Sequence, residues 1–432
     1  MSTPSKTVAF HTLGCKLNFS ETSSISRDFI SSGFEKVDYK EPADFYVINT
    51  CSVTENADKE AKKLIKQAKK RNPESAVIII GCYAQLKPEQ VALIDGVDLV
   101  LGAEEKFNLI EHLDKINLNN RKAKIFQSQI SDTKDFIPSY SYGERTRSYL
   151  KVQDGCDYTC SFCTIPQARG GSRSDTVKKT KEIAEKISNT NIREIVLTGV
   201  NIGDFGKNTS ENFLDLIREL DNLKNLDRIR ISSIEPNLLT DDIIRFCLSS
   251  NKFTPHFHIP LQSGSNKVLK KMRRRYFVEK YAERIDFIKS LNPNSCIGVD
   301  VIVGFPGEEE EDFLKTYEFL SNLDISYLHV FTYSERANTD ALNIRKAVPK
   351  NVRANRSKML RILSEKKKRS FYESSVKSKK LVLFESHKEE KLVGHSDNYI
   401  KVMVPGPKKF INTIKEVQIS HNAGTHVEGM LL

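Results

Sequence analysis

The residues best suited to chemistry in this chain are three cysteines that lie close together. Cys156, Cys160 and Cys163 have the spacing CxxxCxxC. Three thiolates this close cannot all point into a hydrophobic core, but together they can bind one metal centre. A [4Fe–4S] cluster normally takes four thiolates, one for each iron. Three cysteines would therefore hold such a cluster and leave one iron open to another ligand.

A zinc site, or a chance group of buried cysteines, is the alternative interpretation of this triplet. Structural zinc usually has four ligands arranged in paired CxxC or CxxH motifs. No fourth Cys or His lies near the triplet in the sequence. The spacing therefore favours an iron–sulfur cluster with an open iron.

Three more cysteines follow predicted β-strands in the first 125 residues. The strands and cysteines are residues 8–10 before Cys15, residues 45–49 before Cys51, and residues 76–80 before Cys82. Helical patterns near residues 21–32 and 57–71 separate the strands, and this alternation predicts an open parallel α/β domain. Loops that follow parallel strands emerge at one edge of the sheet, so we expect these cysteines to converge. Three unrelated buried cysteines are the alternative.

A second run of alternating strands and helices follows a linker at residues 126–145. Six apolar segments are predicted as strands: residues 149–152, 194–200, 228–233, 257–261, 296–305 and 327–333. Helical patterns separate them, for example at residues 176–187, 213–220 and 310–320. Six β/α repeats predict a partly open barrel whose chemistry lies on the loops after the strands. The CxxxCxxC loop follows the first of these strands, in a domain that we assign to residues 146–370.

The last part of the chain changes character. A basic helix is predicted at residues 350–371, and three alternating segments then follow at residues 381–384, 399–404 and 417–419. Residues 394–397 and 405–407 are predicted turns between strands. We expect residues 371–432 to form a small antiparallel β-barrel.

The composition is that of a globular protein with metal or redox chemistry. The 432 residues include 39% hydrophobic residues and eight cysteines, which is enough chain for about three domains. We find neither a run of eighteen apolar residues nor a signal peptide, and we expect a cytoplasmic protein without a membrane partner. Cysteines in such a chain favour metal or redox chemistry over disulfides.

The charge favours a polyanionic partner. The net charge is +11 and the pI is about 9.0. Residues 341–373 contain eleven Lys or Arg against two Glu, and two other basic runs lie at residues 62–71 and 270–275. Several separate basic faces suit a long folded polyanion such as tRNA. A merely solvated basic surface is the alternative.

Taken together, these segments resemble the radical SAM methylthiotransferase family over essentially the whole chain. Three segments resemble its amino-terminal domain, namely LGCKLN (13–18), NTCSVT (49–54) and GCYAQ (81–85). Three further segments resemble its radical SAM domain, namely residues 153–174, HIPLQSGS (258–265) and DVIVGFPGE (300–308). The tail resembles its small RNA-binding TRAM domain.

Within this family the sequence is most similar to the branch that modifies N6-threonylcarbamoyladenosine in tRNA. The isopentenyladenosine branch typically has Gln-Met-Asn after its first cysteine and an Arg where Thr54 stands, and neither is present here. The ribosomal-protein branch modifies an aspartate of a basic partner, so an acidic tail is expected there. This tail is mildly basic.

The resemblance implies two [4Fe–4S] clusters and S-adenosylmethionine (SAM) as cofactors. Cys156, Cys160 and Cys163 would hold the cluster that chelates SAM and cleaves it to a 5′-deoxyadenosyl radical. Cys15, Cys51 and Cys82 would hold an auxiliary cluster whose open iron carries a sulfur. One SAM would methylate that sulfur, and a second would supply the radical that removes hydrogen from C2 of the adenine. The anticodon stem-loop of tRNA, a reducing electron donor and a sulfur donor are the implied partners.

Other residues are weaker candidates for the cofactor and substrate. The resemblance places Phe162 against the adenine of SAM. Residues at the ends of the second, third and fourth barrel strands are candidates for other parts of SAM: Gly199, Asn201, Ser233, Glu235, Gln262 and Ser263. For the polar ones, ordinary turn chemistry is the alternative.

A pocket for the threonylcarbamoyl group should offer a cation, because a buried unpaired carboxylate costs several kcal/mol. Arg173, after the cluster loop, and Arg336, after the sixth strand, are the candidates. Pairing with a local carboxylate is the alternative for each.

A protein without enzymatic activity is the remaining alternative, namely an iron–sulfur or zinc protein that binds tRNA by shape. Six β/α repeats and a second open cluster argue against it. Cys247 and Cys296 lie in apolar patterns and are interpreted as buried thiols. The nine histidines show no paired metal spacing, and none is assigned as a ligand.

Overall fold

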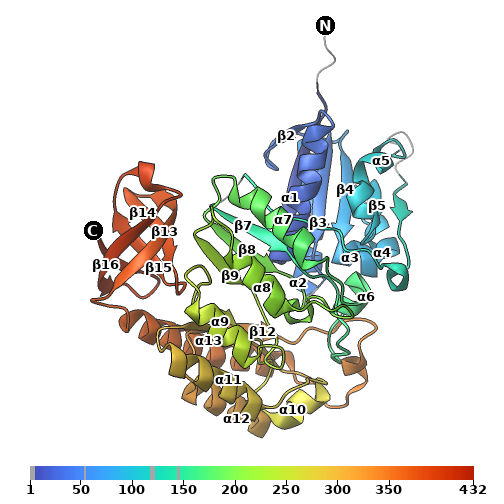
Figure 1. Cartoon of the computed structure of the whole chain (residues 1–432). Helices are drawn as coiled ribbons and strands as arrows, with labels where there is room; N and C mark the ends of the chain where they lie inside the picture. Colours follow the sequence, from blue (N-terminus) through green and yellow to red (C-terminus); the bar gives the residue numbers. More distant parts are fainter. Residues whose placement is uncertain (1–4, 53–54, 117–121, 144–145) are drawn as a thin grey trace.

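The computed structural model describes residues 5–52, 55–116, 122–143 and 146–432. Figure 1 shows three units along the chain: an amino-terminal sheet with helices, a central half-open barrel, and a small carboxy-terminal barrel. Thr54, which bears on the choice of branch, lies outside the described residues.

The amino-terminal unit is a six-stranded, entirely parallel sheet in the order β2-β1-β3-β4-β5-β6. Its strands are β1 (Thr7–Thr12), β2 (Glu35–Val37), β3 (Phe45–Thr50), β4 (Ala76–Gly81), β5 (Leu99–Leu101) and β6 (Lys124–Phe126). Its helices are α1 (Lys16–Ser31), α2 (Glu55–Arg71), α3 (Cys82–Leu86), α4 (Pro88–Ala92) and α5 (Leu109–Leu113). The three predicted strands are confirmed as β1, β3 and β4, which are neighbours in the sheet. The proposed domain boundary at residue 125 falls inside β6.

Both faces of this sheet are covered, as a parallel sheet requires. Alternate side chains of β3 and β4 point to opposite faces, so Ile48 and Ile79 pack in one core while Val47 and Ile78 pack in the other. Strands buried on both faces read as continuous apolar runs, which is why AVIIIG in β4 is recognisable as a strand. α1 begins earlier than the predicted residue 21, at Lys16, directly after Cys15.

The central unit contains six parallel strands in two three-stranded sheets, β7-β8-β9 and β10-β11-β12. The strands are β7 (Arg147–Lys151), β8 (Glu194–Thr198), β9 (Arg228–Ile231), β10 (His256–His258), β11 (Cys296–Val303) and β12 (Tyr327–Thr332). The helices are α6 (Ile165–Arg169), α7 (Val177–Ser188), α8 (Phe213–Asp221), α9 (Asp241–Ser249), α10 (Asn266–Lys271), α11 (Val278–Leu291) and α12 (Glu310–Asn322). All six predicted strands are present, and one core spans both ladders.

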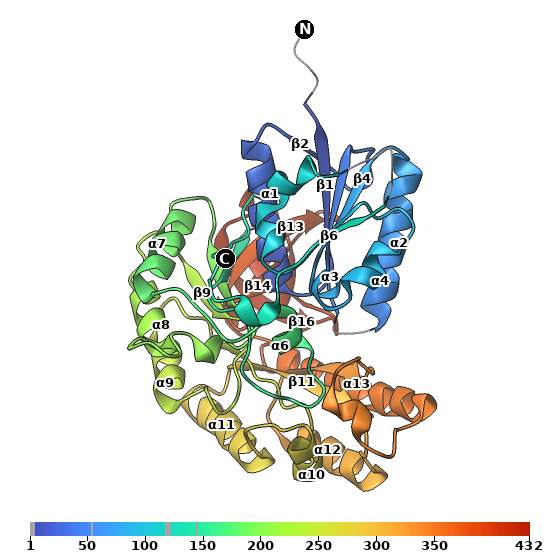
Figure 2. The same cartoon turned by 90° about the vertical axis from the view of Figure 1, so that its right-hand side faces the viewer.

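This barrel is open between its first and last strands. In the described part of the chain no ladder joins β7 to β12. α1 of the amino-terminal unit packs against β7 instead, with Phe19 and Tyr149 in edge-to-face contact at 5.7 Å. The amino-terminal unit therefore stands at the open side of the barrel, as the two views in Figures 1 and 2 show.

The carboxy-terminal unit follows the long helix α13 (Lys350–Glu373), which packs against β12. It is a closed barrel in the order β13-β14-β15-β17-β16, formed by β13 (Lys379–Lys388), β14 (Lys391–Ser396), β15 (Lys401–Pro405), β16 (Ile414–Asn422) and β17 (Val427–Leu431). Four of its ladders are antiparallel, and the ladder between β15 and β17 is parallel.

One predicted turn in this unit is wrong. Residues 394–396 belong to β14, and Gly394 serves close packing of strands rather than a turn. A Cβ at Gly394 would lie 2.1 Å from the carbonyl oxygen of Leu383 on the neighbouring strand. Sequence alone could not distinguish these two uses of glycine.

The small barrel is attached to the amino ends of the first central strands. Arg147 of β7 forms an ion pair of 2.8 Å with Glu385, and Arg228 of β9 donates to the carbonyl oxygens of His395 and Leu381. In Figure 1 this red barrel and the blue sheet lie on opposite sides of β7–β9. None of the described helices is both long and apolar enough to cross a membrane.

Candidate active site

The CxxxCxxC loop follows β7 and is held in place by backbone hydrogen bonds. The Cys156 amide donates to the Gly170 carbonyl (3.0 Å), and the Cys163 amide donates to the Cys160 carbonyl (3.1 Å). Two amides donate to the sulfur atoms, Tyr158 to Cys156 Sγ (3.4 Å) and Ile165 to Cys163 Sγ (3.5 Å). Such N–H···S contacts stabilise negative charge on sulfur, so the loop suits thiolate ligands.

Gly155 gives the loop its tight entry. Its φ is +70°, a left-handed conformation that favours glycine. A Cβ at this position would lie 1.9 Å from the Gly171 carbonyl oxygen. The segments before and after the cysteines therefore approach closely only because residue 155 has no side chain.

Arg274 is a functional candidate that sequence reasoning missed. Its Nη1 lies 3.2 Å from Cys160 Sγ, and its Nη2 forms an ion pair with Glu235. The basic run at residues 270–275 predicts a polyanion-binding face, but this side chain is only 5% exposed. It places a positive charge on one of the proposed cluster ligands. A single Arg in a basic run carries no sequence signal for such a role.

Without a metal, these three thiols hold their protons. Burial raises the pKa of Cys156 to about 12 and that of Cys163 to about 11. Burial also raises the pKa of Cys160, although Arg274 opposes it. The thiolate is the form that binds metal, so a bound metal must supply the charge that removes these protons.

The second triad lies at the carboxyl ends of three adjacent strands. Cys15 follows β1, Cys51 follows β3, and Cys82 follows β4, and Cys82 and Cys15 are close enough to influence each other's charge. Gly14, with φ +98°, packs against Cys51: a Cβ there would lie 3.1 Å from Cys51 Sγ. The predicted convergence of these cysteines is what the sheet produces.

The motif residues beside these cysteines interlock the three loops. Asn18 donates to the carbonyl oxygens of Leu13 (2.9 Å) and Thr50 (3.1 Å). Asn49 donates back to the carbonyl oxygen of Asn18 (3.0 Å), and the Thr50 hydroxyl donates to the Ile80 carbonyl (2.6 Å). These bonds tie the ends of β1, β3 and β4 into one unit that presents the cysteines.

The sulfur atoms of each triad are not gathered at the spacing of a bound zinc ion. Thiolates on one tetrahedral zinc, each at about 2.3 Å, lie about 3.8 Å apart. Among the described residues, the only group of three possible ligand atoms within 4.8 Å of one another is formed by His258, Asp300 and His329. In neither cysteine triad do all three sulfur atoms lie this close together.

A buried network of charges connects the two triads. Glu21 of α1 and Asp154 of the cluster loop share Arg169, whose Nη1 lies 3.0 Å from an oxygen of each. Lys106 lies 2.6 Å from Glu21, and Lys151 lies 3.3 Å from both carboxylates. Burial alone would raise the pKa values of both acids, but the charge of Arg169 first, followed by the lysines, holds them well below their usual range.

This network carries an excess of positive charge. Arg173 also contacts Asp154 (3.3 Å), so four cations share two carboxylates. Arg169 donates to Asn18 as well (2.6 Å) and its charge acts on Cys82. A buried positive excess between the triads favours anionic groups on both of them.

Two small cavities lie between the triads. One, of about 230 Å³, is lined by Phe162, Cys163, Gln262 and Asp300, and the other, of about 210 Å³, is lined by Ser52 and Tyr83, the neighbours of Cys51 and Cys82. The cavities share Thr164 and Arg336. The two cavities are therefore adjacent, one beside Cys163 and the other beside the neighbours of Cys51 and Cys82.

Arg336, which lines both cavities, forms an ion pair across the domain interface. Its Nη1 lies 2.8 Å from Asp58 of α2, and its Nη2 lies 3.5 Å from the other oxygen of the same carboxylate. Arg173 is also engaged, with the carbonyl oxygens of Asp135 (3.0 Å) and Gly171 (3.1 Å) in addition to Asp154. Both predicted substrate arginines thus already have carboxylate partners, and these partners are distant in sequence rather than neighbouring.

Of the predicted SAM residues, Phe162 and Gln262 line the cavity beside Cys163. Phe162 also packs edge to face against Phe305 at 6.2 Å. Asn201 is 3% exposed; its amide nitrogen donates to Asp204 (2.9 Å), and its Oδ1 has no hydrogen-bond partner in the described residues. That oxygen is available to an amino group such as that of SAM.

The other predicted SAM residues do not line this cavity, and they are Gly199, Ser233, Glu235 and Ser263. A Cβ at Gly199 would lie 2.9 Å from the Gln153 carbonyl oxygen, so this glycine allows close packing. Glu235 pairs with Arg274, and Ser263 is fully buried against the Thr316 hydroxyl (3.3 Å), away from the cavity. Ser233 remains half-buried at the end of β9.

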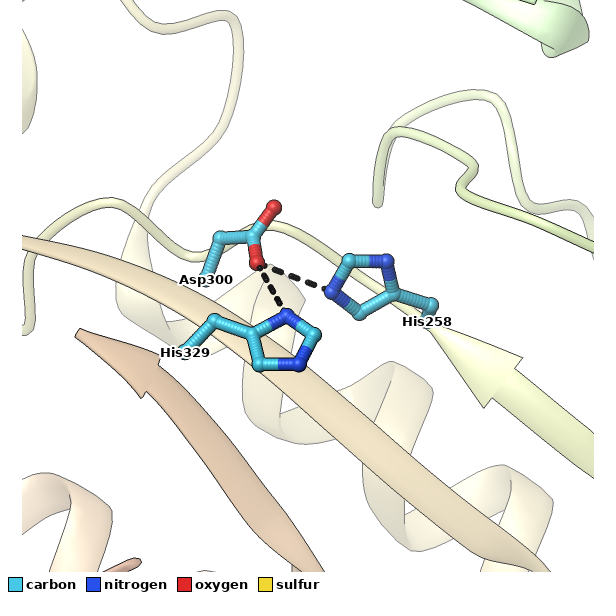
Figure 3. A group of neighbouring side chains, drawn as sticks. All are labelled: His258, Asp300 and His329. Atoms are coloured by element: carbon cyan, nitrogen blue, oxygen red, sulfur yellow. Dashed lines mark hydrogen bonds and ion pairs between the residues drawn. The ribbon is translucent and has the colours of Figure 1, made fainter. Parts of the chain in front are cut away.

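Three polar side chains, one each from β10, β11 and β12, lie together on one face of the second sheet (Figure 3). His258 Nε2 lies 2.9 Å and His329 Nδ1 lies 3.2 Å from the same oxygen of Asp300. These atoms are close enough for a metal ion, but hydrogen bonds already satisfy them. Burial would raise the pKa of Asp300, and the two histidines hold it below its usual range. The sequence signal was a lone acid within the apolar strand 296–303.

Lys16 directly follows Cys15 at the start of α1 and is half-buried. The charges of Arg230, Arg147, Asp300 and Glu194 act on its amine. Burial, assisted by the two arginines, lowers the pKa of Lys16 to about 8. In the sequence this residue stands out only as part of a motif.

Parts of the three basic runs face inward. On α13, Arg353 pairs with Glu335 (2.6 Å) and Arg356 with Glu308 (2.7 Å), and Lys367 donates to the carbonyls of Ser321 and Leu323. The basic run on this helix predicts phosphate binding for all three, but these side chains are engaged within the protein. Four other cations of α13 instead line a groove of about 950 Å³, and residues Ala423–Thr425 of the small barrel form its other wall. These cations are Lys358, Arg361, Lys366 and Arg369. Helix packing, not composition, decides which cations remain outside.

The pairing of Arg274 with Glu235 gives a first expected result. Arg274→Met should lower the free energy of unfolding by about 3 kcal/mol, because it leaves a buried carboxylate without its partner. The double variant Arg274→Met/Glu235→Met should regain most of this loss. Denaturant unfolding at equal iron content measures both variants. Equal stability of the wild type and the single variant would contradict the buried pair.

The predicted core thiols are where the sequence placed them. Cys247 and Cys296 are each 2% exposed. Burial raises the pKa of Cys296 to about 12. These two cysteines are inert packing residues, separate from both triads.

Two family models match the chain. The model described as the radical SAM superfamily matches residues 150–320, and the model described as uncharacterized protein family UPF0004 matches residues 7–102. These spans contain the first and the second cysteine triad, respectively.

Named relatives match over nearly the full length. The threonylcarbamoyladenosine tRNA methylthiotransferase MtaB of Bacillus subtilis is 39% identical over 437 residues, covering 99% of this chain and 96% of that protein. The tRNA-2-methylthio-N(6)-dimethylallyladenosine synthase of Rickettsia bellii is 31% identical, covering 98% and 99%. The radical S-adenosylmethionine methyltransferase TsrM of Kitasatospora setae is similar in structure, with a TM-score of 0.55 at 13% identity over 76% of this chain and 73% of that chain. This last likeness concerns the fold alone.

Proposed function

We propose that this chain, which belongs to the radical SAM methylthiotransferase family and to its MtaB branch, adds a methylthio group to C2 of N6-threonylcarbamoyladenosine in tRNA. The observation that carries this proposal is that two cysteine triads, from two domains, flank one buried charge network and two adjacent cavities. The reaction takes place in the cytoplasm, where tRNA is found.

The residues present fit two iron–sulfur clusters. Each triad offers three thiolates, which leaves one iron of a [4Fe–4S] cluster open. The buried excess of cations between the triads and the contact of Arg274 with Cys160 favour anionic clusters. When bound, two such clusters supply the reductive cleavage of SAM at the first triad and a sulfur for methylation at the second.

The protein's own residues position the reactants. Asn201 Oδ1, buried and free to accept, would take the amino group of SAM, and Phe162 and Gln262 would contact it beside Cys163. The C2–H bond of adenine is not acidic enough for an ordinary base, so both cofactors must face one carbon. The adjacent cavities, which share Thr164 and Arg336 in their walls, would offer that position.

Two further partners follow from the chemistry. Each reductive cleavage of SAM consumes one electron, so a reducing electron donor must dock near the first triad. The product carries away a sulfur atom, so a sulfur donor must restore it at the second. Cys15 is the exposed member of that triad and marks the side from which sulfur would arrive.

The proposal is tested by mass spectrometry of tRNA nucleosides from a strain that lacks this protein. The 2-methylthio derivative of threonylcarbamoyladenosine should disappear while its unmethylthiolated precursor accumulates. Loss of the methylthio derivative of isopentenyladenosine instead would assign the chain to the activity of its other relatives. No change in either nucleoside would favour a protein that only binds RNA.

The groove beside α13 provides an expected result for tRNA binding. Replacing Arg361 and Arg369 with Gln should reduce the slope of log affinity against log salt by about 0.7–0.9 for each phosphate that these side chains neutralise. A matched variant removes the same charge from outer helices, by Lys280→Gln and Lys315→Gln. Filter binding of tRNA over a salt series measures both slopes. Equal slopes would show that the groove is only solvated.

A further inference from the structure

One exposed aromatic ring lies in the wall of the cavity that contains Cys163. Phe331 belongs to β12, and 42% of its surface is exposed. Among the exposed large hydrophobic side chains of the described residues, it is the only one that lines this cavity. Single exposed hydrophobic side chains on outer helices need no explanation, but an exposed ring in the wall of a reaction cavity indicates a ligand that covers it.

The strand register fixes the side of the sheet on which this ring lies. Asp300 of β11 is opposite His329 of β12, and Ile302 is opposite Phe331. Side chains two residues apart on a strand share a face, so Phe331 lies on the face that carries His329 and Asp300 in Figure 3. Asp300 and Ile302 line the same cavity as Phe331. The ring therefore faces the interior of the half-open barrel.

The other two aromatic rings in this cavity wall already have partners. Phe162 packs edge to face against Phe305 at 6.2 Å. Tyr333 packs against the same Phe305 ring at 5.7 Å, holds the guanidinium of Arg353 over its face at 5.3 Å, and is only 5% exposed. In the described part of the chain, Phe331 has no such contact with a ring or a cation. It is therefore the ring that a planar group from outside can cover.

The end of β12 also connects this cavity to the basic groove beside α13. Thr332, the last residue of the strand, lies in the wall of both. Among the described residues that line the groove, Glu365 is the only acid, against four cations. A polyanion that lies in the groove would therefore reach the cavity beside Phe331.

The chemistry requires a base that has left the stack of its neighbours. An enzyme that reacts at an atom of a base takes that base out of the stack, and contacts with aromatic or apolar side chains replace the lost stacking. A base stacked on Phe331 would present its edge to the cavity that contains Cys163. Its phosphates would at the same time be free to follow the cations of the groove.

We propose that Phe331 stacks on the target adenine and holds it at the cavity beside the first triad. This inference rests on the proposed function and names the side chain that replaces the stacking that the base gives up. SAM carries an adenine as well, and it is the competing occupant of this ring.

A double-mutant cycle in equilibrium binding isolates this contact. The RNA ligands are two anticodon stem-loops, one with N6-threonylcarbamoyladenosine at the target position and one that is abasic there. The proteins are the reconstituted wild type, Phe331→Ala, Phe331→Tyr and the control Phe277→Ala, which removes a ring that is 51% exposed before α11. Affinity for SAM, iron content and methylthiolation are measured on the same samples.

Phe331→Ala should weaken binding of the stem-loop that has the base on the order of ten- to a hundredfold, the usual effect of removing an aromatic side chain that stacks on one base. It should leave the affinities for the abasic stem-loop and for SAM unchanged. Phe331→Tyr keeps the ring and should retain most of the affinity. Phe277→Ala removes a ring outside the cavity and should bind both stem-loops like the wild type.

The outcomes separate this inference from the proposed function. Equal loss of affinity for both stem-loops, or no loss for either, would overturn the role of Phe331 while methylthiolation by the wild type still stands. Loss of affinity for SAM alone would overturn it too, and would assign the ring to the adenine of SAM. A wild type that does not methylthiolate the threonylcarbamoyl stem-loop would refute the proposed function itself.

Discussion

Replacing Cys15, Cys51 and Cys82 together with Ala is expected to leave about half of the iron and no methylthiolated product. The two proposed [4Fe–4S] clusters would contribute equal iron, and each triad belongs to a separate domain with its own core. This variant should still cleave SAM to 5′-deoxyadenosine, because the loop that holds Cys156 is unchanged. Iron analysis, product analysis and SAM cleavage under reductant measure the three quantities.

The reciprocal variant replaces Cys156, Cys160 and Cys163 with Ala. It should also leave about half of the iron, but it should lose SAM cleavage completely, since we propose that these thiolates hold the cluster that binds SAM. Cys247→Ala combined with Cys296→Ala is the matched control: two buried thiols are removed, and the iron should stay at the wild-type level. Full iron in either triple variant would refute two separate clusters.

The choice between two N6 substituents gives the second large effect. The reconstituted enzyme should modify a stem-loop with threonylcarbamoyladenosine at least on the order of a hundredfold faster than one with isopentenyladenosine. A site built for a charged or hydrogen-bonding group rejects an analogue that lacks it, because its own buried polar groups are then left unpaired. Single-turnover kinetics with both stem-loops, at equal cluster content, measures the ratio.

Unmodified adenosine in the same stem-loop is the control for the reaction with the base alone. A preference for isopentenyladenosine would move the chain to the activity of its Rickettsia bellii relative. The two-triad arrangement would remain unaffected by that result. Equal rates for the two modified stem-loops would show that the N6 substituent is not read at all.

The amino-acid sequence by itself determined the elements and the positions of the cysteines that we propose as cluster ligands. Parallel strands buried on both faces read as continuous apolar runs, so β3, β4 and β11 were visible within a residue or two. A cysteine that follows such a strand must emerge at the carboxyl edge of the sheet, and this local rule was enough to bring Cys15, Cys51 and Cys82 together. The CxxxCxxC triplet depends on no contact between distant segments, since its three cysteines lie within one loop.

Only the tertiary structure decided what the charged residues do. The basic runs were visible as composition, but the packing of α13 turns Arg353 and Arg356 toward Glu335 and Glu308 and leaves Arg361 outside. Arg336 met Asp58, a residue 278 positions away, on a helix of another domain. The partner of a charged side chain is set by long-range contacts, which sequence spacing does not encode.

The same reason explains why the sequence indicated the wrong role for one glycine and gave no sign of one cation. Gly394 has the sequence context of a turn residue, and only the approach of β13 shows that it makes room for a carbonyl. Arg274 lies in a basic run that indicates another purpose, and only the packed structure shows that it faces Cys160. Local sequence specifies backbone and ligand type, whereas burial and charge pairing exist only once the domains have packed together.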